Sequence, residues 1–484
     1  MHAGELILIA GALLALGLAA SLLAGRLRIP GLVLFLGVGM LIGSDGLGLI
    51  DFGGNRHDFE LAQTVGIIAL ALILFEGGLA AGFGEIRPVL AASLSLATLG
   101  TLLTAIVTGL AATWLLDISL LHGLLVGAIV SATDGAAIFA LLRGSTLKRR
   151  LARTLEGEAG LNDPVAVLLV LGFIEWIRLP DYGLLDVAVL FIQQLGIGVL
   201  VGALVGVAAV KAFRRVNLAT GGLYPVASLA VVALAFGAAD VLHGSGFLAV
   251  YLAGLAMGST ALPARQTVAA FHDGLAWLAQ LTMFLTLGLL VNPAELGPIA
   301  LEGTLLAFVL VFVARPIAVI IATGRAPLSV TERVVLGWAG LRGAVPVVLA
   351  LFPILDGIEG ATDFFNIAFF AVLVSTLLQG STFTFVAGAL GALTNEPALR
   401  RPLVEVGTIR ELGADVVEVP LVEGDAAIGV RVRDLGLPRD ALVNVLVRND
   451  EALPPRGSTR LEAGDRLYVL TRQTAMAALE EARE

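Results

Sequence analysis

The segment Glu156–Pro164, with the sequence EGEAGLNDP, places two glutamates, an asparagine and an aspartate directly before the apolar run VAVLLVLGFIEW. An ionisable side chain at membrane depth costs about 2.5 kcal/mol or more, so each such group is a candidate functional residue. On a helix, Ala159 lies one turn before Asp163 on the same face. Pro164 lacks an amide hydrogen, which leaves the carbonyl of Gly160 without its usual helical partner. The segment therefore offers carboxylate, amide and carbonyl oxygens suited to a small monovalent cation.

The composition indicates a polytopic membrane protein. Of 484 residues, 58% are hydrophobic and 14% are charged, against about 45 to 50% and about 25% in soluble domains. The first apolar run, Glu5–Ala24, lacks a preceding basic region, so we expect a retained span rather than a signal peptide. The lack of cysteine excludes disulfide scaffolds and thiolate metal sites. We expect no cofactor, no metal beyond a transported cation and no nucleic-acid partner.

Apolar stretches of helical length follow one another through most of the chain and predict about thirteen transmembrane helices. They are expected at residues 4–24, 30–48, 62–82, 88–116, 120–142, 152–176, 185–212, 223–241, 246–262, 273–291, 298–323, 332–354 and 364–393.

The charges of the connections predict the orientation. The odd-numbered connections and the tail hold the basic residues Arg26, Arg28, Arg87, Arg143, Lys148, Arg149, Arg150, Arg153, Lys211, Arg214, Arg215, Arg265, Arg325, Arg333, Arg400 and Arg401. The even-numbered connections hold only Arg56 and Arg178 and several acidic residues. The positive-inside rule then places the N-terminus outside and the C-terminus in the cytoplasm. We expect the protein in the cell (inner) membrane.

Two of the expected spans are interrupted. The fifth contains Ser131–Gly135, and the twelfth contains Gly340–Gly343 followed by Pro346, which frees the carbonyl of Arg342. Broken spans at matching places in two halves indicate a transporter's binding site. Because five and twelve are an odd number apart, the repeat of spans 1–6 and 8–13 is expected to be inverted in the membrane.

The last part of the chain has a soluble composition. Residues 394–402 are expected to form a linker after a transmembrane domain of residues 1–393, and residues 403–484 a small cytoplasmic α/β domain. Strands are predicted at Asp415–Leu421, Ala441–Val447 and Arg466–Thr471, separated by turn residues.

The residues expected to carry the chemistry are Thr133, Asp134, Asn162, Asp163 and Arg342. Broken helices expose carbonyls and dipole ends at mid-membrane, which is tolerated only around a protein-lined cavity. The alternative is that each polar group makes an interhelical hydrogen bond that stabilises the bundle.

The motifs SATDGAAIFALLRG, EGEAGLNDPVAVLL, GWAGLRGAVPVVLAL and LLQGST together resemble the electroneutral branch of the monovalent cation:proton antiporter family. The resemblance covers nearly the whole chain and is strongest to bacterial potassium/proton antiporters that carry a soluble tail. It implies that Asp163 binds proton and cation in turn and that Asn162 stands where electrogenic relatives have a second aspartate. It also implies that Thr133 supplies oxygen ligands and that Glu76 is an acidic residue near the cation path.

The resemblance further implies a structural ion pair between Glu158 and Arg342. Arg315 is a second cation at membrane depth, for which Asp134 is a possible partner. Further candidates are Arg315, Glu156 and Ser131.

The chain departs from the family pattern at three positions. Ala159 stands where some members have a serine, whose hydroxyl would coordinate the ion, so the ion preference between K⁺ and Na⁺ stays open. Gly135 stands where many relatives have proline, and Pro164 where many have glycine.

The chemistry of the residues agrees with the resemblance. Burial disfavours the charged carboxylate, so Asp163 can hold a proton and release it when a cation arrives. Asn162 carries no proton in this range, so each cycle is expected to exchange one proton for one cation without net charge.

The tail from Asp415 to Leu470 resembles the C-terminal lobe of the regulator of potassium conductance (RCK, TrkA-C) domains. This implies a dimerising module, a homodimeric protein and regulation by an unidentified small molecule. The nucleotide-binding lobe is missing, because no GxGxxG motif follows a strand. A tail that only aids assembly is the alternative.

Two other function classes would use parts of the same sequence. An RCK-gated cation channel would need a carbonyl-lined filter such as TVGYG, which is absent. An intramembrane aspartyl protease would use Asp134 and Asp163 as carboxylates that share a proton. Two broken helices among thirteen spans suit an alternating-access transporter better than a protease. An enzyme is therefore not expected.

Overall fold

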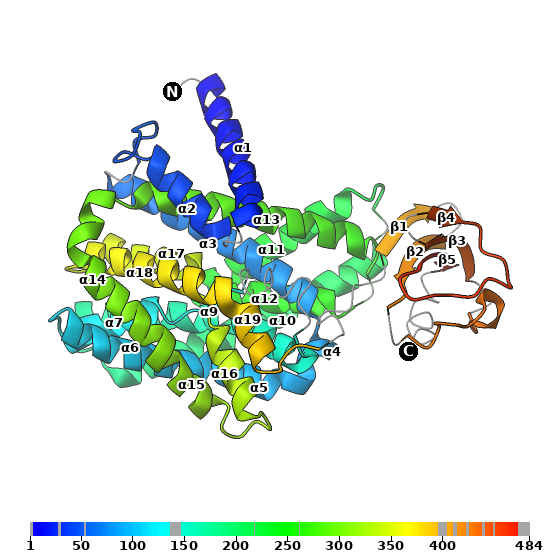
Figure 1. The fold of residues 1–484 in the computed structure, drawn as a ribbon. Coiled ribbons are helices and arrows are strands. Elements are labelled where there is room, and N and C mark those ends of the chain that lie inside the picture. The colour runs from blue at the N-terminus through cyan, green and yellow to red at the C-terminus, as the bar shows by residue number, and fades with distance from the viewer. Residues whose placement is uncertain are drawn as a thin grey trace. The chain divides into compact units, whose positions relative to one another are not determined.

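The computed structural model describes residues 3–27, 31–52, 55–135, 147–216, 218–260, 262–394, 404–409, 414–422, 425–437, 441–448 and 451–472 (Figure 1). The chain forms two compact units, Met1–Leu399 and Arg400–Glu484. Most of the expected linker, residues 395–402, lies outside the described part.

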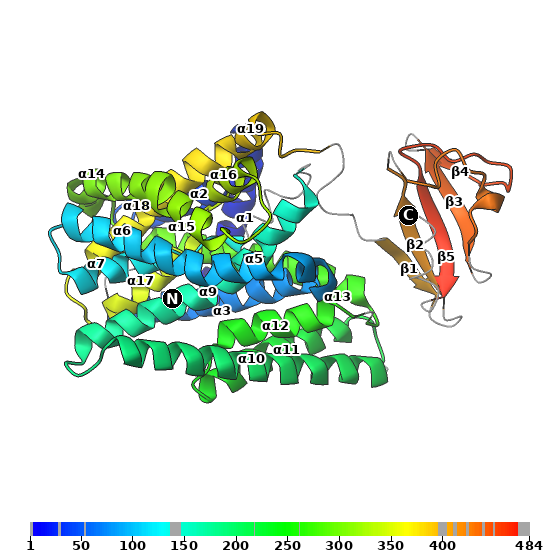
Figure 2. The same ribbon diagram turned by 90° about the horizontal axis from the view of Figure 1, so that it is seen from below.

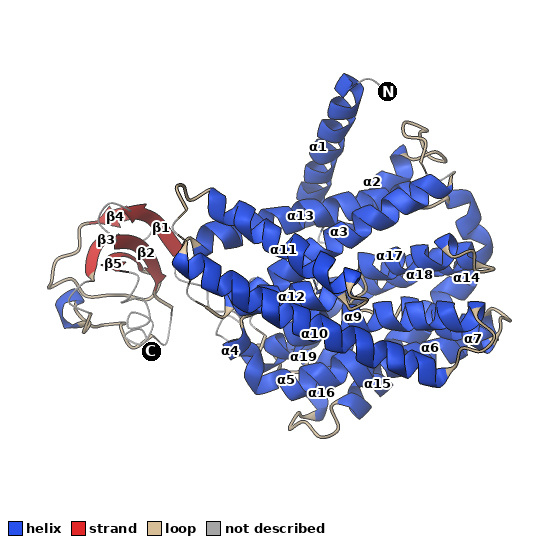
Figure 3. Cartoon of the chain, turned by 180° about the vertical axis from the view of Figure 1, so that it is seen from behind, coloured by secondary structure: helices blue, strands red, loops and turns tan. Residues whose placement is uncertain are grey.

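The first unit is built from helices (Figure 3). In chain order these are α1 (Ala3–Leu27), α2 (Gly31–Ile42), α3 (Arg56–Ala81), α4 (Phe83–Ile86), η1 (Arg87–Val89), α5 (Leu90–Ser95), η2 (Leu96–Gly100), α6 (Thr101–Leu115), α7 (Leu120–Ile129), α9 (Arg149–Arg178), α10 (Leu184–Arg215), α11 (Leu223–Val241), α12 (Gly246–Gly258), α13 (Arg265–Leu290), α14 (Pro293–Val309), η3 (Leu310–Ala314), α15 (Arg315–Ala322), α16 (Val330–Trp338), α17 (Ala344–Leu355), α18 (Ala361–Ser375), η4 (Thr376–Gly380) and α19 (Ser381–Ala389).

The helices confirm a multi-pass membrane protein. In the described part, eight helices are long and apolar enough to cross a bilayer, and five further apolar helices are shorter. Every stretch expected from hydropathy falls at least partly on a helix, while the count of thirteen spans stays a prediction.

Helix α9 is central in this unit, and α10 is peripheral. In the most apolar window of each helix, 72% of α9 is buried against 22% of α10. Helices α10, α11 and α12 pack together along one side of the unit (Figure 2). Polar side chains on α9 are therefore enclosed by protein, whereas much of α10 lies on the surface of the unit.

Helices α3 and α12 approach each other through glycines. A Cβ at Gly254 would lie 2.5 Å from the carbonyl oxygen of Phe75, and one at Gly78 would lie 2.4 Å from that of Tyr251. Small residues let the backbones of membrane helices pack closely. The contact fixes α12, and with it Tyr251, against α3.

The two breaks lie where the sequence predicted them, and they touch. Residues 130–134 after α7 and residues 339–343 between α16 and α17 are not helical. The amide of Asp134 donates to the carbonyl of Leu341 across 2.8 Å. A Cβ at Gly343 would lie 1.7 Å from Asp134 Oδ2, so this contact requires a residue without a side chain.

Single π-helical turns interrupt three other spans, at η2, η3 and η4. Such turns are rare and often occur at functional sites. The turns η2 and η3 fall in the fourth and eleventh expected spans, and the breaks fall in the fifth and twelfth. Both the turns and the breaks are thus seven spans apart. This equal spacing supports the inverted repeat, which stays a proposal.

The second unit contains a five-stranded antiparallel sheet in the order β1-β2-β5-β3-β4. Its strands are β1 (Val404–Ile409), β2 (Ala414–Pro420), β3 (Leu442–Arg448), β4 (Glu451–Leu453) and β5 (Arg466–Arg472). The three predicted strands are confirmed as β2, β3 and β5. The helical half of the expected α/β domain is not found in the described residues, where the only helical element of this unit is the 3-10 turn η6 (Val432–Asp434).

Candidate functional site

The two polar residues at the middle of α9 are fully enclosed. Asp163 is 2% exposed and Asn162 is not exposed. The helix continues through Pro164, although this residue cannot donate a backbone hydrogen bond. Both side chains therefore project from a continuous, buried helix.

Asn162 ties α9 to the first break. Its Nδ2 donates a hydrogen bond to Oγ1 of Thr133, which is itself buried. The Oδ1 atom of Asn162 has no hydrogen-bond partner among the described residues. The contact orients the amide and positions the break next to Asp163.

Asp163 lies on the wall of a small cavity. The cavity volume is about 20 Å³, room for a single water or a small desolvated ion. Its walls are formed by Leu70, Ile73, Leu74, Gly77, Asp134, Gly135, Ala159, Gly160, Asp163, Tyr251, Gln280, Met283 and Val345. Oδ1 of Asp163 has no hydrogen-bond partner among the described residues. A buried oxygen without a partner is costly, so it marks a place for a proton, a water or a cation.

Tyr251 closes one side of the cavity. A Cβ at residue 160 would lie 2.2 Å from the tyrosine ring, so Gly160 makes room for it. The buried Tyr251 hydroxyl has no hydrogen-bond partner among the described residues. Because Gly160 lies three residues before Asp163, the ring covers the face of α9 that carries the carboxylate.

Arg342 holds the two breaks together. Its Nη1 donates to the carbonyl of Ser131 across 2.5 Å. Its backbone amide donates to Ser375 Oγ at 3.0 Å, and its carbonyl accepts from Thr376 Oγ1 at 2.8 Å. Nε and Nη2 have no hydrogen-bond partner in the described part of the chain. Ser131 thus contributes its carbonyl, while its hydroxyl donates to the carbonyl of Ala128.

The predicted ion pair between Glu158 and Arg342 is wrong. Glu158 is bound by Arg315, whose Nη1 and Nη2 donate to its two carboxylate oxygens at 2.5 and 2.9 Å. Both side chains are buried, with 0% and 2% of their surface exposed. The carboxylate that Arg315 binds is therefore Glu158, where the sequence suggested Asp134.

The structural reason for this pairing lies in α15 and the second break. Arg315 begins α15 directly after the π turn η3. Its chain crosses Gly340, where a Cβ would lie 2.6 Å from Arg315 Nε. The glycine of the break therefore opens the path by which Arg315 reaches α9.

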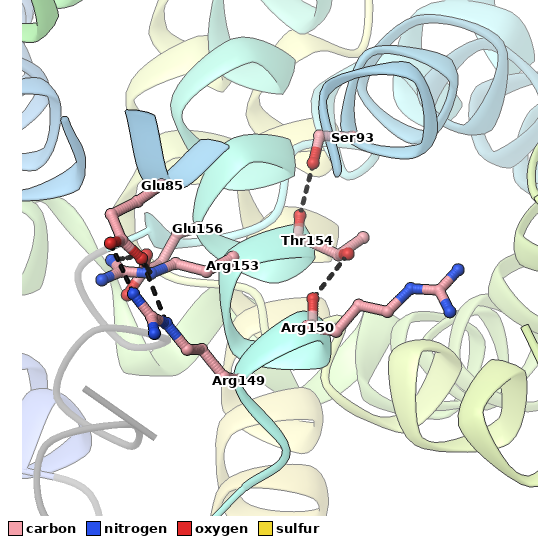
Figure 4. Close-up of polar contacts among 7 residues, drawn as sticks. All are labelled: Glu85, Ser93, Arg149, Arg150, Arg153, Thr154 and Glu156. Atoms are coloured by element: carbon pink, nitrogen blue, oxygen red, sulfur yellow. Dashed lines mark hydrogen bonds and ion pairs between the residues drawn. The ribbon is translucent and has the colours of Figure 1, made fainter. Parts of the chain in front are cut away.

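Glu156 belongs to a charged cluster at the start of α9 rather than to the cavity (Figure 4). Its Oε2 accepts from Arg153 Nη1 at 2.7 Å. Glu85 accepts from Arg149 Nη2 at 2.5 Å and from Arg153 Nε at 3.1 Å. In the same region Ser93 donates to the carbonyl of Thr154 at 3.1 Å, which ties α5 to α9. The cluster joins α4 to the first turns of α9.

Glu76 is half-buried on α3 and is not on the cavity wall, to which α3 contributes its neighbours Ile73, Leu74 and Gly77. Two polar cavity residues, Tyr251 and Gln280, were not found from the sequence. Each is an isolated polar residue in an apolar span, and that was the available signal.

The comparisons with known proteins agree with this geometry. Residues 11–388 match the family model described as "Sodium/hydrogen exchanger, transmembrane", and residues 416–482 match that of the TrkA-C domain. A relative from Shewanella baltica named K(+)/H(+) antiporter NhaP2 is 40% identical over 477 residues, which cover 98% of this chain and 82% of the relative. A relative from Alkalimonas amylolytica named K(+)/H(+) antiporter NhaP is 38% identical, over 96% of this chain and 80% of the relative.

A structural relative extends the comparison to the fold. The sodium proton antiporter MjNhaP1 from Methanocaldococcus jannaschii aligns with a TM-score of 0.70 and 25% identity, over 80% of this chain and 99% of that one. Family model, close relatives and fold all point to the same class. This chain belongs to the sodium/hydrogen exchanger family.

Proposed function

We propose that the chain is a secondary antiporter that exchanges K⁺, or Na⁺, for H⁺ by alternating access. The observation that carries the proposal is the buried Asp163 carboxylate, which has an oxygen without a partner among the described residues and faces a small cavity beside two touching helix breaks. One carboxylate that binds either a proton or a cation couples the two fluxes.

Exchange is electroneutral in this proposal. Asn162 is neutral and is engaged with Thr133, so Asp163 is the residue that changes charge in each cycle. Asp134 and Thr133 would complete the environment of the ion from the first break, and Tyr251 would limit access to it. Glu158 and Arg315 neutralise each other and would fix α9 to α15 without taking part in transport.

K⁺ is the preferred cation in this proposal, because the relatives that match nearly the whole chain are named K(+)/H(+) antiporters. A Halobacillus aidingensis relative that is 29% identical over 78% of this chain is named Na(+)/H(+) antiporter NhaH. Na⁺ is therefore the alternative.

The proposal includes an assembly and an orientation. Basic residues at the odd-numbered connections support a C-terminus in the cytoplasm and an N-terminus outside. The TrkA-C match supports a homodimer whose tail senses a small molecule and adjusts transport.

The direct test is flux in proteoliposomes containing the purified protein. A pH gradient, acid inside, should drive K⁺ or Na⁺ into the vesicles against its own concentration gradient. The rate should not change when the membrane potential is varied. Passive flux that only follows the cation gradient would support a channel, and a rate that scales with the potential would contradict electroneutral exchange.

A further inference from the structure

We propose that Gln280 is a cation ligand of this transporter and that it determines the preference between K⁺ and Na⁺. The inference rests on the proposed antiport function. It adds a residue from α13 to a site otherwise built from α9 and the first helix break.

The position of Gln280 carries the inference. Gln280 is 7% exposed and lies on the wall of the same cavity as Asp163. In the described part of the chain its side chain makes no hydrogen bond, and, unlike Asp163 Oδ1, its amide atoms are not completely buried. A buried amide without a partner costs free energy unless water or an ion satisfies it.

Gln280 borders the cavity among apolar residues of its own helix and of α3. Met283, the next cavity residue on α13, is apolar, and so are the α3 residues of the wall. An alanine or leucine at position 280 would be the cheaper choice for a purely structural position in an apolar span. The amide therefore has a role toward the contents of the cavity.

The chemistry of an amide carbonyl fits the missing ligand. Ala159 lines the cavity one turn before Asp163 and supplies no oxygen. A side-chain carbonyl at Gln280 supplies one without adding charge, so the one-for-one exchange at Asp163 is preserved. The number and field strength of the carbonyl dipoles around an ion are one physical basis for a preference between K⁺ and Na⁺. A neutral carbonyl in place of a hydroxyl is thus a determinant of selectivity.

The test compares Gln280→Leu, Gln280→Asn and Gln280→Glu with the wild-type protein in proteoliposomes, with Gln193→Leu as control. Gln193 is an exposed glutamine of α10 and does not line the cavity. Loss of one neutral ligand should raise the half-saturating K⁺ concentration about tenfold in Gln280→Leu. The ratio of K⁺ to Na⁺ affinity should change as well, which a purely structural role would not produce. The control should match the wild type.

Two further variants sharpen the result. Ala159→Ser in the Gln280→Leu background should restore part of the cation affinity, because it returns an oxygen to the cavity. Gln280→Glu adds an ionisable group, and its transport should become sensitive to the membrane potential. Cation-dependent thermal stabilisation of the purified proteins should follow the same order.

The outcomes separate this inference from the proposed function. Unchanged K⁺ half-saturation and an unchanged K⁺ to Na⁺ ratio in Gln280→Leu would overturn the role of Gln280 while antiport stands. If Gln280→Leu does not fold, the same two quantities in Gln280→Asn decide. A wild-type protein without coupled exchange would overturn the proposed function instead.

Discussion

Neighbouring residues on α9 have different partners. Asn162 donates to Thr133, Asp163 faces the cavity, and Glu158 is bound by Arg315. A carboxylate that faces a cavity can exchange ligands, whereas a bidentate buried pair is held in place. Glu158 and Asp163, five positions apart, thus differ in their surroundings, and in the proposed function only Asp163 takes part in transport.

Because Glu158 is bound by Arg315 and not by Arg342, the fold should depend more on Arg315. Arg315→Met leaves Glu158 buried and unpaired, which should cost about 3 to 5 kcal/mol of stability. Arg342→Met removes a hydrogen bond to a carbonyl but leaves no carboxylate without its partner. Thermal unfolding in detergent should therefore show a large loss for Arg315→Met and a smaller one for Arg342→Met.

Two controls complete this comparison. The double variant Glu158→Leu, Arg315→Met should regain most of the stability, because no buried charge is left alone. Arg178→Ala, which breaks an exposed pair with Asp356, should change stability by about 1 kcal/mol or less. Equal losses for Arg315→Met and Arg342→Met would contradict the assignment.

At the scale of elements, the site exists because two broken spans meet. The contact between Asp134 and Leu341 is a backbone hydrogen bond, and Gly343 leaves room for the Asp134 side chain. This contact brings the ends of the broken helices and their carbonyl groups together beside α9. A transporter can rearrange such a contact without exposing backbone to lipid.

Gly343→Ala tests this contact. The added methyl group would lie 1.7 Å from Asp134 Oδ2, so the Asp134 side chain or one of the breaks must shift. We expect loss of cation-driven proton flux in everted vesicles, with the protein still present in the membrane. The matched control is Gly337→Ala on α16, where a Cβ would meet nothing within 4 Å. Full activity of Gly343→Ala would show that the close contact is not needed.

The sequence predicted the elements of the site better than their pairing. The breaks, the enclosed Asn162 and Asp163, and three strands of the tail follow from local signals: glycine and proline in apolar spans, polar residues at membrane depth, and alternating patterns. The partner of Glu158 does not follow, because two arginines lie at membrane depth and only the packing of α15 decides between them. Tyr251 and Gln280 were missed for the same reason, since their spans meet α9 only in the folded unit.

At the scale of the whole molecule, a helical unit and a sheet unit are joined in one chain, and each has its own core. In the sheet unit, Arg448 crosses from β3 to Asp465 and Glu462 near the start of β5. Burial disfavours the charged form of Asp465, but hydrogen bonds from Arg448 and from the Glu462 amide outweigh it and hold the pKa of Asp465 below its usual value.

This lowered pKa predicts a pH dependence for the tail. A carboxyl whose pKa is lower in the folded state stabilises the fold above the unfolded pKa, about 3.9, and this stabilisation is lost as the pH falls through the folded pKa. Asp465→Asn should therefore speed hydrogen exchange in the β3 and β5 peptides of the full-length protein at about pH 7. The difference from the wild type should shrink at about pH 3.5 and below. A difference that is independent of pH would show that the charge of Asp465 is not what stabilises the sheet.

The central claim is that Asp163 alone carries proton and cation in turn. Its most direct test measures H⁺ and K⁺ fluxes together in proteoliposomes with wild-type protein and with Asp163→Asn, after both are shown to be folded by thermal unfolding. The account predicts one proton released for each cation taken up by the wild type, at any membrane potential, and neither flux for Asp163→Asn. Coupled exchange that survives in Asp163→Asn would contradict it.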